Sequence, residues 1–113
     1  EGWIPEADII QVFENELGLF ISEGFFVTVI PYQNQREFLG LERQYKGACA
    51  KVGLPCDVSK EWTLDSSIGR EFIQQHPFAS QQVVASKQHL LSRYDESEGP
   101  GHQVGLVVVR LGR

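Results

Sequence analysis

Length, composition and charge limit the classes of protein to which this chain can belong. At 113 residues and 42% hydrophobic content, residues 1–113 form one domain around a single core. No apolar run approaches the ~20 residues that span a bilayer, and no signal peptide is recognisable, so we expect an intracellular protein without membrane contact. The net charge of −5 argues against a free-standing nucleic-acid binder, although one wall of a composite site remains open. Glu1 in place of Met fits a piece excised from a longer chain.

Cysteines and histidines argue against a metal site. Cys49 and Cys56 stand seven residues apart across a Gly-Leu-Pro turn and could reach one another to pair. Alternatively, Cys49 is a small core residue of a helix and Cys56 opens a strand. Two cysteines without a secretory signal are typical of intracellular thiols, which favours this second interpretation. The histidines lack the spacing of metal ligands: His76, His89 and His102.

The first predicted elements are a helix and a strand. Apolar residues at steps of three and four predict a helix from about residue 6 to 21, and residues 22–24 break it. Residues 25–30 are apolar except for Thr28, as in a strand that is buried on both faces of a helix-covered parallel sheet. Pro31 is expected to end this strand.

A second helix carries signals at both ends. Asn34 and Glu37 have the spacing of a capping box, although Asn replaces the usual Ser or Thr. An apolar face continues to Val52. Gly53 then supplies a left-handed position, and Pro55 stops the helix. The pattern predicts a strand–helix unit over residues 25–52.

The remaining elements are less regular. Residues 58–64 predict a short strand with Trp62 and Leu64 facing one way, and a turn follows at 65–67. His76-Pro77 is expected to end any local helix, because the residue before proline avoids the helical conformation. Residues 80–94 fit either a helix capped by Ser80 or a strand at 82–86 before a helical turn. Residues 104–111 predict a second buried strand. This order of elements is typical of an α/β layered domain.

Three stretches resemble the second RecA-like motor domain of superfamily 1 helicases, the Upf-like branch that acts on RNA or DNA. Residues 29–35 read Val-Ile-Pro-Tyr-Gln-Asn-Gln and are similar to that family's Thr-Pro-Tyr-x-x-Gln motif. Residues 63–71 read Thr-Leu-Asp-Ser-Ser-Ile-Gly-Arg-Glu and are similar to its Thr-Val-Asp-Ser-x-Gln-Gly-Arg-Glu motif. Val83-Val84, residues 90–94 and residues 105–109 resemble worn versions of its last motifs.

The resemblance implies a fold and a set of site residues. It implies a mostly parallel sheet with helices on both faces, in the three-layer RecA-like arrangement. Arg93 would be an arginine finger that reaches a γ-phosphate. The residues implied at a nucleotide cleft are Tyr32, Gln35, Gly69, Arg70 and Glu71. Those implied to face single-stranded nucleic acid are Thr63, Asp65 and Ser66.

Each of these residues also has an ordinary structural interpretation. Arg93 is equally a surface residue beside Asp95 and Glu96, and Arg70 with Glu71 is equally a local ion pair on a solvated turn. The polar residues Thr63, Asp65 and Ser66 equally cap the following turn. Gln35 is equally an ordinary first-turn helix residue, and Gly69 is a loop glycine in either interpretation.

The chain departs from the helicase pattern in ways that matter for catalysis. Ile68 stands where the family has Gln, which removes a polar contact. The chain has no G-x-x-x-x-G-K-[ST] phosphate loop and no Asp-Glu metal motif, so it should not hydrolyse a nucleotide alone. We expect no cofactor bound by this chain alone. ATP and Mg²⁺ are implied only for a parent protein, in which a first RecA-like domain, in cis or in trans, would complete the cleft.

Two functions of other classes stay open. One is a stand-alone α/β domain that binds a protein partner, with homodimerisation through an exposed sheet edge. The other is a small-molecule-binding domain with an aromatic pocket. The aromatic candidates for that pocket are Phe20, Phe26, Trp62 and Phe72.

Overall fold

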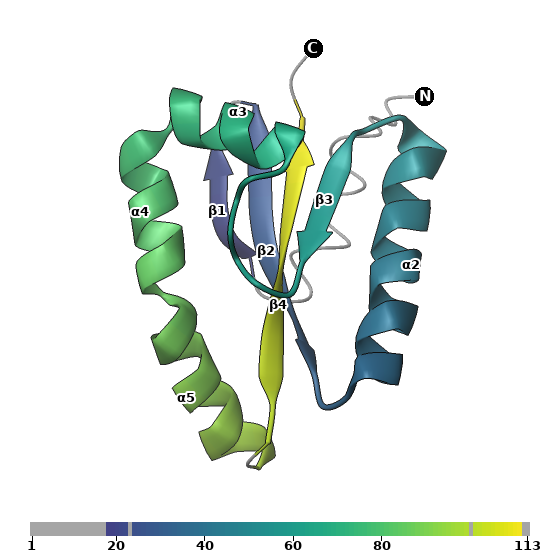
Figure 1. The fold of residues 1–113 in the computed structure, drawn as a ribbon, viewed down its shortest axis with the longest axis vertical. Helices are drawn as coiled ribbons and strands as arrows, with labels where there is room; N and C mark the ends of the chain where they lie inside the picture. The colour runs from purple at the N-terminus through teal and green to yellow at the C-terminus, as the bar shows by residue number, and fades with distance from the viewer. Residues whose placement is uncertain (1–17, 23, 100, 112–113) are drawn as a thin grey trace, which may run out of the picture.

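Residues 18–22, 24–99 and 101–111 are described by a computed structural model. In this part of the chain, four strands form one sheet (Figure 1). They are β1 (Gly18–Ser22), β2 (Phe25–Tyr32), β3 (Cys56–Ser59) and β4 (Gln103–Arg110). The strand order is β1-β2-β4-β3, and each neighbouring pair is antiparallel. The expected mostly parallel, RecA-like sheet is therefore wrong.

The path of the last strand explains the antiparallel pairing. After β3 the chain crosses one face of the sheet through three helices and returns as β4 between β2 and β3. β4 starts opposite the end of β2, where Gln103 pairs with Tyr32, and runs back until Arg110 pairs with Phe25. Since β2 and β3 both oppose β4, these two strands run in the same direction without being neighbours.

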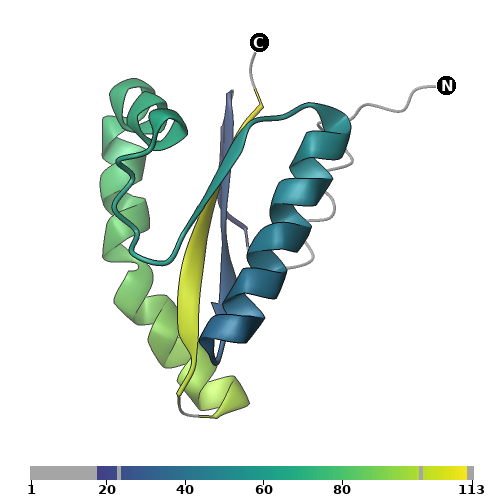
Figure 2. The ribbon, with the colours of Figure 1, turned by 45° about the vertical axis from the view of Figure 1, so that its right-hand side comes forward.

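Helices cover both faces of the sheet, as expected (Figure 2). The helix α2 (Gln35–Val52) lies on one face, and α3 (Ser67–Gln75), α4 (Pro77–Ala85) and α5 (Lys87–Glu98) lie on the other. Side chains alternate along β2. Phe26 and Ile30 pack in the core beneath α2, whereas Phe25, Val27 and Val29 pack in the core beneath α3–α5. This alternation explains why the run 25–30 of β2 is apolar except at Thr28.

The N-terminal helix expected over residues 6–21 is not what the described residues show. Residues 6–17 lie outside the described part, and residues 18–22 form the strand β1. β1 pairs with β2 across a tight turn in which Ser22 faces Phe25 and Gly24 has φ +104°. The predicted break at 22–24 is thus a turn between two strands. Pairing with β2 overrides the helical spacing of this segment.

The strand β2 runs one residue past the proline that was expected to end it. Pro31 pairs with Val104 of β4, and the strand closes at Tyr32. β1 reaches along β2 only as far as Thr28, so the ladder with β1 has already ended before Pro31. Proline is tolerated where its missing N–H removes no ladder hydrogen bond.

The helix α2 begins and ends as predicted. The Glu37 N–H donates to Asn34 Oδ1 at 2.8 Å, and the Glu37 carboxylate accepts from the Gln33 N–H at 2.6 Å. At the other end Gly53 has φ +76°, and the Leu54 N–H donates to the Cys49 carbonyl at 3.0 Å. Local capping therefore determines both ends of this helix.

The segment predicted as a strand over 58–64 is mostly irregular. β3 covers Cys56–Ser59, and the chain then crosses the sheet face without strand pairing. Trp62 and Leu64 are both buried in the core beneath α3–α5, so their predicted common direction is confirmed. The Trp62 indole N–H donates to the Val104 carbonyl at 3.0 Å. This side-chain contact replaces the backbone pairing of a strand.

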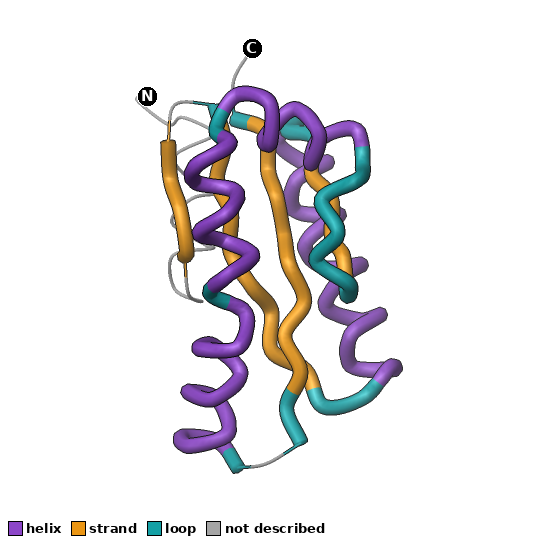
Figure 3. Tube along the Cα trace, turned by 60° about the vertical axis from the view of Figure 1, so that its left-hand side comes forward, coloured by secondary structure: helices purple, strands orange, loops and turns teal. Residues whose placement is uncertain are grey.

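Along the chain, the three helices α3, α4 and α5 connect this crossing segment to β4 (Figure 3). The predicted turn at 65–67 and loop at Gly69 are corrected, because α3 begins at Ser67. The helix end predicted at His76-Pro77 is confirmed, since α3 ends at Gln75, and a further helix, α4, begins directly at Pro77. The helical alternative for 80–94 is confirmed, but Ser80 lies inside α4 and donates to the Pro77 carbonyl rather than capping a helix. No described helix combines the length and apolar character needed to cross a bilayer.

Candidate functional site

The residues that the helicase resemblance assigns to a nucleotide lie at two ends of the sheet. Tyr32 and Gln35 lie where β2 ends and α2 begins. The others lie on α3: Gly69, Arg70 and Glu71. α3 packs at the start of β2, where the Phe25 and Phe72 ring centroids are 5.5 Å apart. Since the eight residues of β2 span about 25 Å, the two groups do not form one cleft.

The polar residues before α3 are engaged with their own chain. The Thr63 hydroxyl donates to Asp65 Oδ1 at 2.8 Å, and both side chains are exposed. The Ser66 hydroxyl accepts from the Gly69 N–H at 3.0 Å and caps α3. Capping, the ordinary interpretation of this Asp-Ser segment, is therefore observed for Ser66.

Gly69 permits a close approach between α3 and the segment before it. A Cβ added at this position would lie 2.8 Å from the carbonyl carbon and oxygen of Leu64. The glycine is buried, and its neighbour is protein backbone. The need for glycine is thus explained without a nucleotide.

The charged residues Arg70 and Glu71 lie in different surroundings. Arg70 is exposed, and its backbone N–H donates to the Ser66 carbonyl at 2.8 Å. The Glu71 carboxylate lies 3.3 Å from Nε of Arg110 on β4. The predicted local ion pair between Arg70 and Glu71 is therefore replaced by a pair that joins α3 to the sheet.

Backbone strain is concentrated next to this motif. Trp62 has φ +61° and Leu64 has φ +55°, in the left-handed region that side chains with a Cβ rarely adopt. Each such residue costs about 1–2 kcal/mol. Burial of both side chains, and the indole hydrogen bond to Val104, hold them in place. The strain lets the crossing segment follow the sheet face.

Arg93 lies far along the chain from α3, on the exposed side of α5. Within the described residues it forms no ion pair with Asp95 or Glu96, since the two side-chain ion pairs found join Lys46 to Glu42 and Arg110 to Glu71. Its neighbour Tyr94 faces a pocket, but Arg93 does not line it. The arginine-finger role stays a prediction.

The aromatic residues considered for a small-molecule pocket are divided between the two faces of the sheet. Phe26 packs in the core beneath α2, whereas Trp62 and Phe72 pack in the core beneath α3–α5. The side chain of Phe20 lies outside the described residues. Phe26, Trp62 and Phe72 are therefore core residues on opposite faces of the sheet, and the expected pocket built from them is corrected.

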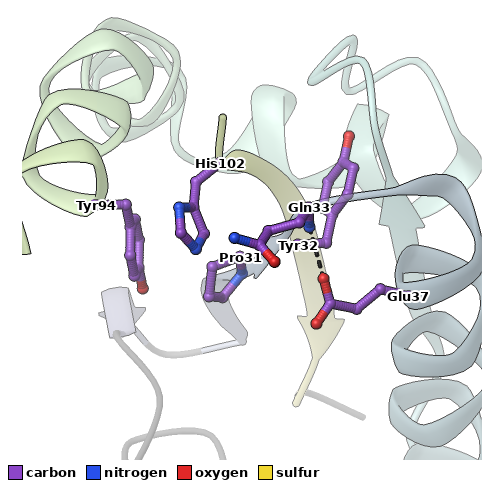
Figure 4. A pocket seen from close by; sticks show the side chains of 6 residues that line it. All are labelled: Pro31, Tyr32, Gln33, Glu37, Tyr94 and His102. Atoms are coloured by element: carbon purple, nitrogen blue, oxygen red, sulfur yellow. Dashed lines mark hydrogen bonds between the residues drawn. The ribbon is translucent and has the colours of Figure 1, made fainter. Parts of the chain in front are cut away.

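A different pocket opens at the end of the sheet where β2 finishes and β4 begins (Figure 4). Its volume is about 320 Å³, within the range of small-molecule sites. Its lining comes from the end of β2, the start of α2, α5 and the turn before β4: Pro31, Tyr32, Gln33, Glu37, Tyr94 and His102. Tyr32 is thus the one predicted cleft residue that lines this pocket.

Two rings form one wall of the pocket. The rings of Tyr94 and His102 stack, with centroids 6.4 Å apart and planes inclined by 24°. The Gln33 side-chain amide extends toward His102 (Figure 4). His102 Nδ1 lies 2.9 Å from the Gly99 carbonyl, and a carbonyl only accepts, so Nδ1 carries a proton. In the neutral ring Nε2 is then left as an acceptor.

Negative charge marks the opposite wall. The Glu37 carboxylate accepts the N–H of Gln33, the residue before the N-cap Asn34, so one of its two oxygens is already engaged. Burial, and then the charge of Glu61, raise the pKa of Tyr32 above its ordinary value. The phenol therefore stays neutral at physiological pH. Among the described residues, no Lys or Arg lines the pocket.

Sequence reasoning found only part of this pocket. In the sequence, Gln33 lies within the first helicase-like motif, Glu37 belongs to a capping box and Tyr94 ends a worn motif. His102 carries no signal beyond its lack of metal-ligand spacing. Their common location depends on β4 starting opposite Tyr32, which no local pattern reveals. Among the described residues, no group of three or more His, Cys, Asp or Glu is arranged to hold a metal ion.

Comparison with known proteins identifies no family for this chain. No family model, no curated protein and no solved structure matches the chain.

Proposed function

We propose that this domain binds a flat, nitrogen-containing ring of the nucleobase kind in the pocket at the end of β2. The observation that carries the proposal is the stacked pair of Tyr94 and His102, whose centroids are 6.4 Å apart along one wall of a pocket of about 320 Å³. Aromatic walls hold flat rings by stacking, at about 1–3 kcal/mol per base.

The polar groups of the pocket favour a ring that carries N–H donors. The Glu37 carboxylate and His102 Nε2 accept hydrogen bonds, and the Gln33 amide both donates and accepts. An exocyclic amine or ring N–H satisfies such acceptors. A purely hydrocarbon ring would leave them desolvated without a partner.

The same charges disfavour a phosphate. A helix N-terminus usually attracts anions, but Glu37 already occupies this end of α2, and the lining has no Lys or Arg. The net charge of −5 adds to the repulsion. We therefore infer that the free base or nucleoside binds more tightly than the corresponding nucleotide.

The helicase motor-domain function stays a prediction from the motif resemblance. One contact is in its favour: the Lys60 ammonium donates to Gln35 Oε1, which links the segments that follow β3 and β2. The antiparallel sheet and the separation of Tyr32 from Arg70 weigh against it. On this hypothesis the chain would still need a first RecA-like domain, ATP with Mg²⁺ and single-stranded nucleic acid.

An amide NMR titration of the chain with adenosine and with ATP tests the ring-binding proposal. We expect adenosine to shift the signals of Gln33, Glu37 and His102, and to bind more tightly than ATP. Tyr94→Ala should weaken binding at least tenfold, while Ser92→Ala, at an exposed position of the same helix, should leave it unchanged. Tighter binding of ATP, with shifts centred on α3, would instead support the nucleotide cleft.

A hydrolysis assay tests the motif argument within the motor-domain prediction. The isolated chain should release no phosphate from ATP, since its sequence has no phosphate loop. Sustained release that Arg93→Ala abolishes would contradict that argument and would support the arginine-finger role.

A protein partner is the second candidate function. Phe78 on α4 is 72% exposed and Val84 is 48% exposed, unusual for large apolar side chains. A homodimer through a sheet edge stays a prediction of the same class. Light scattering with Phe78→Ser as the variant tests association: a monomer at all concentrations would exclude the homodimer.

A further inference from the structure

The two cysteines lie together at the end of α2 opposite the pocket described above. Cys49 is in the last turns of α2, and Cys56 is the first residue of β3. The left-handed Gly53 and the bond from the Leu54 N–H to the Cys49 carbonyl fold the chain back between them. This short turn brings both cysteines to the lining of one pocket.

The thiols are free and hydrogen-bonded to one another. Cys49 is 2% exposed and Cys56 is half-buried. The hydrogen bond with Cys56, followed by burial, raises the pKa of the Cys49 thiol. The same bond, with Cys49 as donor, lowers the pKa of Cys56 against the opposing effect of burial. The pKa values of the two thiols therefore shift in opposite directions, and Cys56 is the more readily deprotonated of the pair.

Both cysteines open onto a shallow pocket of about 430 Å³. Lys46 lines it, one turn before Cys49 on α2, and its charge also lowers the pKa of Cys56. Lys46 is paired with Glu42 at 3.2 Å, and the neighbouring Asp57 acts in the opposite direction on Cys56. The remaining lining is small or apolar: Ala50, Gly53, Leu54 and Pro55.

We propose that Cys56 and Cys49 form a redox-active thiol pair that exchanges with small disulfides, with Cys56 as the attacking thiol and Cys49 as the resolving thiol. Three observations carry this: the shared pocket, the direct contact between the thiols, and the lysine beside them. Reactive cysteines typically lie in partly exposed surroundings near a cationic side chain, as Cys56 does beside Lys46.

The reaction has two displacement steps. The Cys56 thiolate attacks one sulfur of a disulfide RSSR, the S–S bond breaks, and the first RS⁻ leaves and takes a proton. Cys49 then loses its proton to solvent, its sulfur attacks the Cys56 sulfur, and the second RS⁻ leaves. The protein dithiol loses two electrons and two protons, and the small disulfide becomes two thiols. Once the Cys56 sulfur is part of the mixed disulfide, it is no longer the thiolate that accepts a hydrogen bond from the Cys49 thiol.

Treatment of the full chain with glutathione disulfide, followed by intact-mass and peptide mass spectrometry, tests the assignment of roles. We expect an internal Cys49–Cys56 disulfide in the unsubstituted chain. Cys49→Ser should retain one glutathione on Cys56, whereas Cys56→Ser should leave the buried Cys49 unmodified. Cys49→Ala serves as the alternative variant if Cys49→Ser does not fold. Equal glutathionylation of both cysteines without an internal disulfide would overturn the proposal.

A matched pair of lysine variants tests the pocket. Lys46→Ala should slow the reaction of Cys56 with glutathione disulfide several-fold at neutral pH. Lys51→Ala, on the same helix but outside the pocket, should leave the rate unchanged. Equal rates in both variants, or reaction only after urea unfolds the chain, would show that Cys56 is an ordinary structural thiol.

Discussion

Glu71 on α3 and Arg110 on β4 form an ion pair in which the carboxylate Oε1 lies 3.3 Å from the guanidinium Nε. The two side chains are 42% and 38% exposed, yet the Nε atom itself is enclosed and forms no hydrogen bond. The pair joins a helix to the strand next to β2. A carboxylate assigned by resemblance to a nucleotide thus has a partner in its own chain.

This ion pair should stabilise the fold only weakly. The coupling free energy between the two side chains, obtained from Glu71→Ala, Arg110→Ala and the double variant, should be about 0.2–1 kcal/mol. It is small because solvent screens the two charges. A double-mutant cycle by urea denaturation measures it. A coupling above about 2 kcal/mol would show that the pair behaves as a desolvated one.

Gly69→Ala should destabilise the domain by about 1–3 kcal/mol, since the new methyl group would lie 2.8 Å from the Leu64 carbonyl. Gly47→Ala is the control, because Gly47 is exposed on α2 with nothing near its Cβ position. That control should gain up to about 1 kcal/mol from helix propensity. Urea denaturation compares the two, and a neutral Gly69→Ala would contradict the close approach of α3.

Ser66→Ala should cost about 0.5–2 kcal/mol, because the hydroxyl accepts the Gly69 N–H at the start of α3. Ser67→Ala, one residue later and exposed, should change stability by less than about 0.5 kcal/mol. Thermal unfolding followed by circular dichroism gives both values. If Ser66→Ala instead left stability unchanged but weakened binding of single-stranded DNA, the nucleic-acid role would be favoured over capping.

Stability should fall at alkaline pH through Tyr32. Its pKa is raised in the folded state above 10.0, so the folded protein holds the phenol proton more tightly than the unfolded chain does. This contribution is complete below pH 10 and is lost as pH rises through the folded pKa. Tyr32→Phe should flatten the decline in unfolding free energy over this range. Glu61→Gln should flatten it less, because burial is the larger cause.

Local patterns in the sequence were sufficient for α2 and for the burial of β2 and β4. Asn34, Glu37 and Gly53 act within one turn of their own helix, so their spacing is readable without knowledge of any partner. The apolar runs of β2 and β4 likewise required helices on both faces, and both faces are covered.

The candidate sites were readable only in part. The motif resemblance singles out Tyr32, but its companions Tyr94 and His102 are more than 60 residues away along the chain. The motif around Gly69 was visible, yet its polar groups cap α3 and its glycine fits against Leu64. A short motif does not show whether its side chains face a ligand or their own backbone.

The sequence alone determined where α2 begins and ends, which strands are buried and that a helix ends at His76-Pro77. Only the tertiary structure decided that β4 lies between β2 and β3 and opposes both. The physical reason is range: caps and apolar periodicity depend on neighbours within a few residues, whereas strand direction depends on partners up to 85 residues distant, as for Phe25 and Arg110. A strand buried on both faces has the same composition in a parallel and an antiparallel sheet.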